Sequence, residues 1–177
     1  MPIANDPEVS LRVADVADAL CLGVLAQQVF LDTYATGGIR PALAREVLSQ
    51  FSTQAMAAQF DRRDARLLVA ERDGHLLGFA QVGLQVPQGQ VPASRPAELE
   101  RLYVQEPFTR QGIGSALLRQ AEQAAAVAGA DAMWLTPWVH NHRALAFYAR
   151  QGYLDRGAAW YVFEDERHEN RVLSRPL

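Results

Sequence analysis

The sequence predicts a single α+β domain in which helices cover both faces of a mixed β-sheet. Strand-like and helix-like patterns follow one another in the order β-ααα-β-β-β-α-β-α-β-β. The dipeptide Asp73-Gly74 joins two strand-like runs and is typical of an antiparallel hairpin, because both central residues of such a turn need positive φ. Strands and helices alternate after that region, which is typical of parallel crossovers. Together these observations favour a mixed sheet over an all-parallel one.

The length of 177 residues suits one domain over residues 1–177. A chain of this size buries roughly 70% of its unfolded surface, and the 49% share of hydrophobic residues is enough for a core. The formal net charge is -3 and the arginines are scattered along the chain, so we expect no basic face for nucleic acid. The mild acidic excess fits a cationic small molecule better than a phosphate-rich partner.

Targeting signals and cysteine usage predict a cytoplasmic protein with no membrane partner. Residues 1–7 lack the basic region and the apolar run of a signal peptide, and no stretch is expected to reach the length that spans a bilayer. The single cysteine, Cys21, excludes a disulfide within the chain and lies in an apolar helical pattern. We predict that it is a small buried hydrophobic residue rather than a reactive thiol.

The first half of the chain predicts one strand, three helices and a hairpin. A strand is expected over 9–13, and Asp15 is a candidate N-cap for the helix that follows. Apolar residues recur near helical spacing in that helix, namely Val16, Leu20, Val24 and Leu31. After a break at Gly37-Gly38, further helices are expected over 41–51 and 53–60, and the hairpin strands over 66–72 and 76–84.

The second half predicts a loop followed by alternating strands and helices. The loop over 85–96 holds three prolines and a glycine. A strand over 98–104 leads to a helix over 112–128, which Gly129 ends. Further on we expect a strand over 133–136, a helix over 142–151 ended by Gly152, and strands over 153–156 and 159–163 around Gly157. Residues 173–177 end the chain.

The turn Gly112-Ile113-Gly114 joins a strand to a long helix and is a candidate phosphate site. The first turn of a helix has unpaired N–H groups, and its dipole favours anions. Glycines without a Cβ let a phosphate approach the backbone, and Arg110 adds a cation beside the turn. The same pattern is also typical of an ordinary glycine-rich helix start. A Walker loop needs a lysine where Ser115 stands, and a Rossmann fingerprint needs a glycine where Leu117 stands, so neither fits.

Two motifs resemble the Gcn5-related N-acetyltransferase (GNAT) superfamily. Residues 109–114 resemble its Gln/Arg-x-x-Gly-x-Gly/Ala motif, with Thr109 in the place of Gln or Arg. Residues 134–153 resemble its second signature, which is a strand, an Asn and then Ala-x-x-Phe-Tyr-x-x-x-Gly-Phe/Tyr. Two motifs in this order and spacing are far more specific than either one, and the resemblance covers residues 67–177.

The resemblance implies a fold, a co-substrate and a set of binding residues. The GNAT fold has a mixed, largely antiparallel sheet of six to seven strands, which splays between strands 4 and 5. The implied co-substrate is acetyl-CoA, with no metal. The turn would hold the pyrophosphate, the strand before it would pair with the pantetheine arm, and Arg110 could supply the donor that Thr109 lacks. The implied binding residues are Leu102, Tyr103, Val104, Thr109, Arg110, Gln111, Gly112, Ile113, Gly114, Ser115, Asn141 and Tyr148.

The catalytic residues that the resemblance implies are Tyr148 and a carboxylate. Tyr148 would protonate the leaving thiolate, although the position also fits a core aromatic, and Asn141 also fits an ordinary helix N-cap. A primary ammonium has a pKa near 10.4, so about one molecule in a thousand is free base at pH 7. A carboxylate that acts directly or through water is the usual base. We expect Glu100 in this role, with Glu98 as the alternate, and both also fit a solvated strand face.

A looser resemblance to the PaiA-type bacterial polyamine acetyltransferases implies a polyamine acceptor. It rests on residues 30–34, 98–104, 134–138 and 174–177, and acidic residues such as Asp32 and Glu100 suit such a substrate. The alternatives are another small amine, an amino acid or a peptide N-terminus. A non-catalytic acetyl-CoA sensor is an alternative of another class. Homodimers are common in the family, so a homodimer is an expectation of the resemblance.

Two polar clusters receive a plain structural interpretation. His140 and His142 fit surface residues that flank Asn141 better than a metal pair, because no carboxylate or thiolate accompanies them. Residues 164–166 fit a solvated acidic turn.

Overall fold

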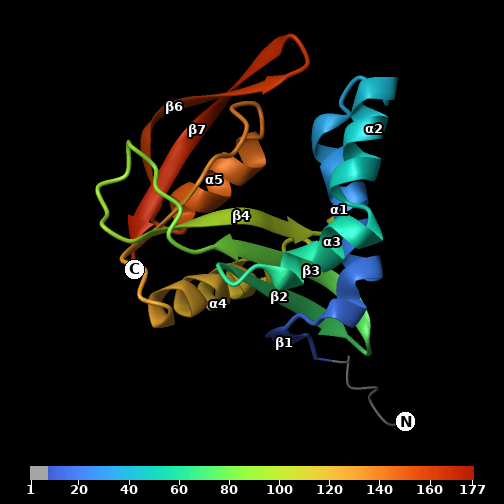
Figure 1. Cartoon of the computed structure of the whole chain (residues 1–177), viewed down its shortest axis with the longest axis horizontal. Coiled ribbons are helices and arrows are strands. Elements are labelled where there is room, and N and C mark those ends of the chain that lie inside the picture. Colours follow the sequence, from blue (N-terminus) through green and yellow to red (C-terminus); the bar gives the residue numbers. More distant parts are fainter. Residues whose placement is uncertain (1–7) are drawn as a thin grey trace. The chain divides into compact units, whose positions relative to one another are not determined.

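The computed structural model describes residues 8–177, so the expectation for residues 1–7 lies outside the described part. The chain divides into two compact units. The first unit comprises the residues up to 81 together with 101–121, and the second comprises 82–100 together with 122–177. The single domain expected from the length stays a prediction. The order of strands and helices is the expected one up to the helix at residues 142–150 (Figure 1).

Within the described residues 8–177, seven strands form a sheet in the order β1-β2-β3-β4-β5-β7-β6. They are β1 (Ser10–Val13), β2 (Ala65–Arg72), β3 (His75–Gly83), β4 (Pro96–Val104), β5 (Ala132–Leu135), β6 (Leu154–Phe163) and β7 (Glu166–Pro176). β4 pairs with β5 in parallel, whereas the pairs β1–β2, β5–β7 and β6–β7 are antiparallel. The mixed, largely antiparallel sheet is therefore confirmed.

The hairpin turn forms as the sequence predicts. Asp73 and Gly74 have φ values of 50° and 76°, which is the left-handed conformation that a two-residue hairpin turn requires. Near the C-terminus the predicted strands are too short. The two runs around Gly157 are one strand, β6, interrupted by a bulge. The strand β7 (Glu166–Pro176) was not predicted. The polar stretch at the start of β7 lacks the alternation that would have identified it as a strand.

The first unit packs helices against β1–β3. The helices are α1 (Ala19–Tyr34), α2 (Pro41–Gln50) and α3 (Thr53–Ala58), with short 3-10 helices at Val16–Asp18 and Gln59–Asp61. Leu22 and Leu25 of α1 pack in a core with Phe51 and Phe79. Gly23 permits this contact, because a Cβ atom there would lie 2.5 Å from the Phe51 carbonyl oxygen. A small residue thus brings α1 close to the segment before α3.

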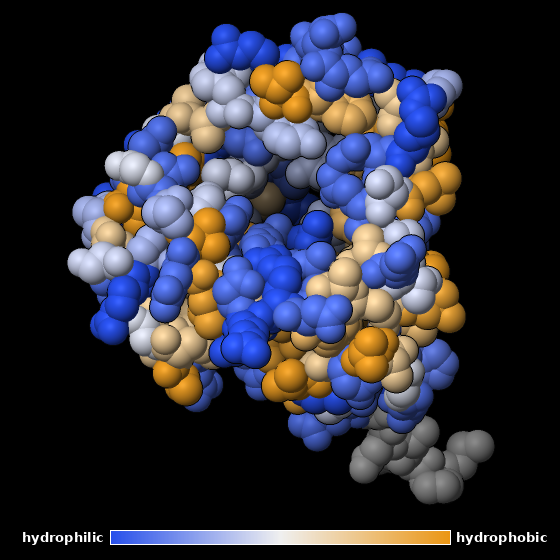
Figure 2. Space-filling view, in the orientation of Figure 1, coloured by the Kyte–Doolittle hydropathy of each residue, from blue (hydrophilic) through white to orange (hydrophobic). Residues whose placement is uncertain are grey.

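The outer face of the helical stretch 16–34 corrects one expectation. Val16, Leu20 and Val24 recur at helical spacing, but they lie on the exposed face, with 61%, 60% and 59% of their surface accessible. On the face of the molecule that Figure 2 draws, hydrophobic residues occur among hydrophilic ones. Cys21 is exposed, so its predicted burial is wrong. The helix is apolar on both faces, and periodicity alone could not tell which face would be buried.

The same helical stretch corrects the expectation about membrane spans. Val16–Tyr34 is long and apolar enough to cross a bilayer by length and composition, so the statement that no stretch reaches this length is wrong. A core helix of a folded protein meets the same two criteria. Leu22, Leu25 and Ala26 of this stretch are buried in the core of the first unit.

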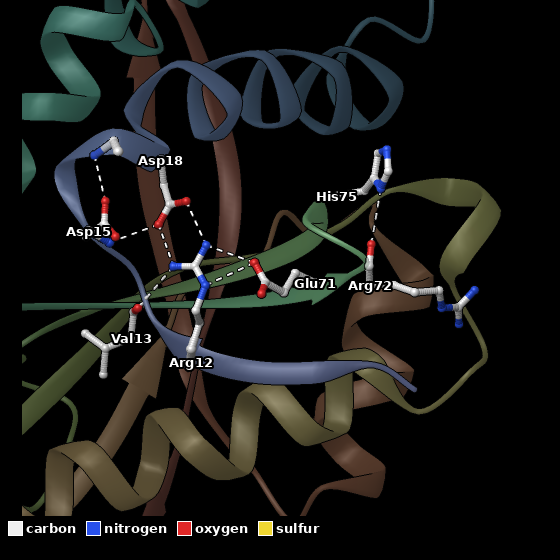
Figure 3. A network of polar contacts seen from close by, with 8 residues as sticks. Arg12, Val13, Asp15, Asp18, Glu71, Arg72 and His75 are labelled. Atoms are coloured by element: carbon white, nitrogen blue, oxygen red, sulfur yellow. Dashed lines mark hydrogen bonds and ion pairs between the residues drawn. The ribbon is translucent and has the colours of Figure 1, made fainter. Parts of the chain in front are cut away.

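An ion-pair cluster ties β1, the first 3-10 helix and β2 together (Figure 3). Arg12 donates to both carboxylate oxygens of Asp18, at 2.7 and 2.8 Å, and its Nε donates to Glu71 at 3.0 Å. These hydrogen bonds lower the pKa of the Asp18 carboxyl and raise the pKa of Arg12. Asp15 caps the 3-10 helix, since its Oδ1 accepts from the Ala17 amide at 2.8 Å.

The second unit holds β5, β7, β6 and α5 (His142–Arg150), with a long loop before β4. Trp134 lies in a small core with Val91 and Val172, and its indole N–H donates to the Val86 carbonyl at 2.9 Å. Asp131 fixes the end of the loop by accepting from the amides of residues 94 and 95, at 3.0 and 2.9 Å. These hydrogen bonds lower the pKa of the Asp131 carboxyl.

Candidate functional site

The turn between β4 and α4 (Ile113–Val127) has an unusual backbone. Arg110 and Gly112 have φ values of 62° and 83°, and positive φ is uncommon for a residue other than glycine. A Cβ atom at Gly112 would meet no atom within 4 Å, so the space beside its backbone is open. The chain therefore makes two left-handed bends immediately before α4 and leaves room at the second.

Two side chains of the turn form hydrogen bonds within it, and a third does not. The Thr109 hydroxyl donates to the Glu106 carbonyl at 2.9 Å, and the Gln111 amide donates to the Pro107 carbonyl at 3.2 Å. Arg110 is exposed and makes no hydrogen bond or ion pair with any of residues 8–177. Thr109 and Gln111 thus brace the turn, while the Arg110 guanidinium can meet an anion.

The start of α4 presents backbone donors. The first intrahelical hydrogen bond runs from the Ala116 amide to the Gly112 carbonyl at 3.0 Å, so the amides of Ile113 and Gly114 precede the hydrogen-bond ladder of the helix. Ile113 is only 4% exposed, and its side chain anchors the start of the helix, while Ser115 in the first turn is half-buried. These features make the turn suitable for an anion such as a phosphate.

At the end of β4, in the first unit, the main chain rather than the side chains can contact a ligand. Leu102, Tyr103 and Val104 are half-buried. The Tyr103 ring packs edge-on against Phe79, with ring centroids 5.4 Å apart, and burial raises the pKa of its phenol. A Cβ atom at Gly78 would lie 2.6 Å from the Tyr103 carbonyl oxygen, so a glycine is needed there. The Tyr103 side chain belongs to the core, which leaves only its main chain for a ligand.

The first part of β4 carries the two candidate bases in the second unit. The register between β4 and β5 ends at the pair Glu98 and Trp134, whereas β4 continues to Val104. This register agrees with the expected splay of strands 4 and 5. Glu100 lies beyond the last pair and is half-buried. A Cβ atom at Gly83 would lie 2.5 Å from its Oε1, so the glycine makes room for the carboxylate.

Asn141 begins α5 in the second unit. Its Oδ1 accepts from the Ala144 amide at 3.1 Å, which confirms the N-cap interpretation. Its side-chain amide nitrogen donates to none of the described residues 8–177, so its two N–H donors can serve a ligand. The neighbouring His140 and His142 belong to no group of three or more His, Cys, Asp or Glu side chains that could hold a metal, within the same range.

Tyr148 lies on the buried side of α5 and is 8% exposed. Its ring meets those of Phe147 and Tyr153 edge-on, with centroids 5.1 and 5.5 Å apart. Its carbonyl accepts from the amides of Gln151 and Tyr153, at 3.0 and 3.1 Å. The end of the helix thus folds back onto Tyr148, which restricts the movement of its side chain.

A polar cluster behind Tyr148 was not apparent from the sequence. The Tyr153 hydroxyl donates to Glu122 at 2.9 Å, and the Arg175 guanidinium lies 3.4 Å from the same carboxylate oxygen. Burial raises the pKa of the Tyr153 phenol, and the nearby Glu122 carboxylate raises it further. These residues come from α4, the segment after α5, and β7, and no local signal links them. The cluster holds Tyr153 against Tyr148.

Comparisons with known proteins agree on one family. Residues 38–153 match the model of the Acetyltransferase (GNAT) family. The chain is 22% identical over 153 residues to an uncharacterized N-acetyltransferase in the pepI 3' region of Lactobacillus delbrueckii subsp. lactis, covering 86% of this chain and 88% of that protein. It is 34% identical over 128 residues to the IAA acetyltransferase of Azospirillum brasilense, covering 72% and 74% respectively.

Solved structures agree in fold. The crystal structure of the PaiA N-acetyltransferase from Thermoplasma acidophilum in complex with coenzyme A matches with a TM-score of 0.74 and 20% sequence identity. The match covers 96% of this chain and 99% of that one. At this identity the likeness concerns the fold.

Proposed function

The chain belongs to the acetyltransferase (GNAT) family, and on this premise we propose that it transfers an acetyl group from acetyl-CoA to a primary amine of a small molecule. The reaction class, N-acetyl transfer, follows from the family. The turn at Arg110 and Gly112 is the observation that carries the proposal furthest, because its geometry suits the pyrophosphate of the donor.

We assign the pyrophosphate to the backbone of residues 110–114. The amides of Ile113 and Gly114 and the N-terminal end of the α4 dipole favour an anion. The open space beside Gly112 lets phosphate oxygens reach those amides. Arg110 supplies the side-chain cation, because the Thr109 hydroxyl is already bound to the Glu106 carbonyl. The pantetheine arm is assigned to the main chain of residues 102–104 and to the Asn141 amide.

We assign Tyr148 as the acid that protonates the leaving thiolate. The amine nitrogen attacks the thioester carbonyl carbon, the new C–N bond forms and the C–S bond breaks as the intermediate collapses. The Tyr148 phenol gives its proton to the departing sulfur and regains one from solvent. The ring contacts with Phe147 and Tyr153 support this role, because they hold the phenol in one orientation.

We assign the base to Glu100, acting directly or through a water molecule. The amine must lose a proton before it attacks, and a nearby carboxylate accepts that proton. Glu100 lies beyond the last β4–β5 pair, whereas Glu98 is the last residue inside the paired region. The space that Gly83 leaves for the Glu100 carboxylate supports the choice. No covalent acyl-enzyme is required, so transfer takes place in a ternary complex.

We propose a polyamine as the acceptor class. The net charge of -3 and the exposed Asp32 on α1 suit a polycation. The relative from Azospirillum brasilense carries the name IAA acetyltransferase, so acceptors other than polyamines, including amino acids and peptide N-termini, belong in the same test. A homodimer is the proposed assembly, which light scattering on the purified protein would check.

A thiol-release assay with acetyl-CoA and a panel of acceptors tests the proposal. The panel contains spermidine, spermine, short monoamines, amino acids and a short peptide. We expect thiol release that depends on both the amine and the protein and is fastest with a polyamine. Turnover restricted to amino acids or peptides would contradict the acceptor class. Binding of acetyl-CoA without turnover of any amine would instead identify a sensor module and contradict the enzymatic proposal.

A further inference from the structure

A cavity of about 430 Å³ lies in the second unit, between α5 and the two-stranded arm of β6 and β7. Figure 1 shows this arm beside α5. Four apolar side chains line most of the cavity, namely Val139, Leu145, Ala149 and Leu173. None of the residues that line it is assigned above to donor binding or to proton transfer. The cavity is large enough for a small organic molecule.

Besides Tyr153, three charged side chains line the rest of the cavity, and two of them are carboxylates. Arg171 binds Asp155 through two parallel hydrogen bonds of 3.0 and 2.9 Å, and its third nitrogen donates to Glu169 at 3.3 Å. Two carboxylates thus share one guanidinium, so the group carries one net negative charge. The hydrogen bonds from Arg171 lower the pKa of the Asp155 carboxyl, which keeps it ionised at neutral pH. An anionic ligand would meet a guanidinium whose hydrogen-bonding sites are largely occupied.

The combination of walls and charge selects a ligand class. Apolar walls favour a hydrocarbon or aromatic body. The excess carboxylate favours a positively charged group at the same end of the ligand as Asp155 and Glu169. We propose that this cavity is a binding site for an organic amine with an apolar body. A short polar cation such as methylammonium would lose the apolar contacts, and a carboxylic acid would lose the charge contact.

The position of Tyr153 connects the cavity with Tyr148. Tyr153 lines the cavity, and its ring lies 5.5 Å from that of Tyr148. Its hydroxyl is held by Glu122, so the ring cannot turn away without breaking that hydrogen bond. An occupant therefore presses on the residue that orients Tyr148. Any effect of this contact on the turnover of acetyl-CoA rests on the proposed function, whereas binding to the cavity does not.

Calorimetric titration of the full chain without acetyl-CoA tests the site. The probes are hexylamine, hexanoate of similar length and opposite charge, and methylamine without the apolar body. We expect hexylamine to bind at least about tenfold more tightly than hexanoate or methylamine. A tenfold change in affinity is what the loss of one contact of moderate strength produces. Hexanoate that binds as tightly as hexylamine would overturn the proposal.

Two variants and their controls locate the binding. Ala149→Phe fills the cavity and should abolish hexylamine binding, whereas Ala146→Phe, on an exposed part of the same helix, should leave it unchanged. Glu169→Gln removes the excess charge, leaves Asp155 paired with Arg171 and should weaken binding by about fivefold. This second variant keeps the test valid if the larger side chain disturbs folding, which circular dichroism would reveal.

A last variant separates this site from the proposed acceptor site. Glu100→Gln should leave hexylamine binding unchanged, because Glu100 does not line the cavity. Hexylamine binding that responds to Glu100→Gln but to neither cavity variant would assign the amine to the acceptor site and overturn the inference. Thiol release by the unmodified protein is measured separately, so failure of the cavity site and failure of the acetyltransferase proposal give different results.

Discussion

The turn at residues 109–115 and the stretch 141–153 offer a ligand different parts of the chain. The turn offers backbone, because two left-handed residues and the start of α4 expose amides while Thr109 and Gln111 brace the loop. The stretch around α5 offers side chains, namely the Asn141 amide and the Tyr148 phenol. A site made of backbone tolerates changes of side chain but not of conformation. A site made of side chains shows the opposite sensitivity.

The largest expected effect is on turnover and comes from a substitution in the stretch 141–153. Tyr148→Phe keeps the ring contacts with Phe147 and Tyr153 but removes the acid, so turnover should fall about 100-fold or more. The affinity for acetyl-CoA should change less than about twofold, because the phenol acts on the leaving group. Thiol release and equilibrium binding measured on one preparation check both values, with Tyr161→Phe in the exposed part of β6 as the control. Lost binding with retained turnover would mean that Tyr148 has a purely structural role.

The next effect concerns the base. Glu100→Gln should lower kcat/KM at pH 7 by about 100-fold. The rate should then rise with pH as the free-base fraction of the amine increases, tenfold for each unit below the amine pKa of about 10.4. A pH profile of thiol release measures this, with Glu98→Gln as the matched control on the same strand. A profile with unchanged shape and height would exclude Glu100 and move attention to Glu98.

A smaller effect, on acetyl-CoA affinity, is expected from a substitution in the turn at residues 109–115. Gly112→Ala forces a side chain into a φ of 83°, at a cost of about 1–2 kcal/mol, and the turn should relax away from the ligand. We expect acetyl-CoA affinity to fall about tenfold. Gly38→Ala is the control, because Gly38 also has positive φ and open space around it but lies outside the turn. Both variants should lose similar stability, and an equal loss of affinity in both would argue against the cradle.

A weaker effect is expected from the one exposed cation of the turn. Arg110→Ala should weaken acetyl-CoA binding about three- to tenfold, because the guanidinium is exposed and salt screens it. The salt dependence of binding should also become flatter. Arg119→Ala serves as the control, because Arg119 is an exposed arginine on α4, outside the turn. If both substitutions weaken binding equally, the effect is one of general charge and not of the turn.

The smallest effect concerns the support behind Tyr148. Tyr153→Phe removes the hydrogen bond to Glu122 but keeps the ring against Tyr148. The free energy of unfolding should fall by about 1 kcal/mol, the usual net value of one hydrogen bond. Turnover should change less than about threefold. Chemical denaturation and thiol release measure the two quantities, and a loss of turnover as large as that of Tyr148→Phe would show that the phenol of Tyr153 takes part in the chemistry.

Local signals in the sequence predicted much of the fold. The Asp73-Gly74 turn and the helix ends at Gly129 and Gly152 rest on backbone conformations that only a few residue types adopt readily, and all of them form. The N-cap at Asn141 forms for a similar reason. These features depend on a few neighbouring residues, so they can be predicted without knowledge of the tertiary structure.

Features that depend on distant partners were missed or misplaced. The buried face of α1 is set by what packs on it, so the exposed positions of Leu20 and Cys21 could not be predicted from an apolar pattern on both faces. The start of β7 is polar and becomes a strand because it pairs with β6. Glu122 and Arg175 are far apart in the sequence and meet through the fold. The roles assigned to the site residues stay predictions.

An NMR titration with coenzyme A shows whether the turn at residues 110–114 holds the pyrophosphate, because it reports on each backbone amide. We expect the amides of residues 110–114 to show the largest chemical-shift changes, and Thr109→Val to leave these changes in place. Unchanged amides at residues 110–114 while coenzyme A binds elsewhere on the chain would contradict the claim that the turn holds the pyrophosphate through its backbone.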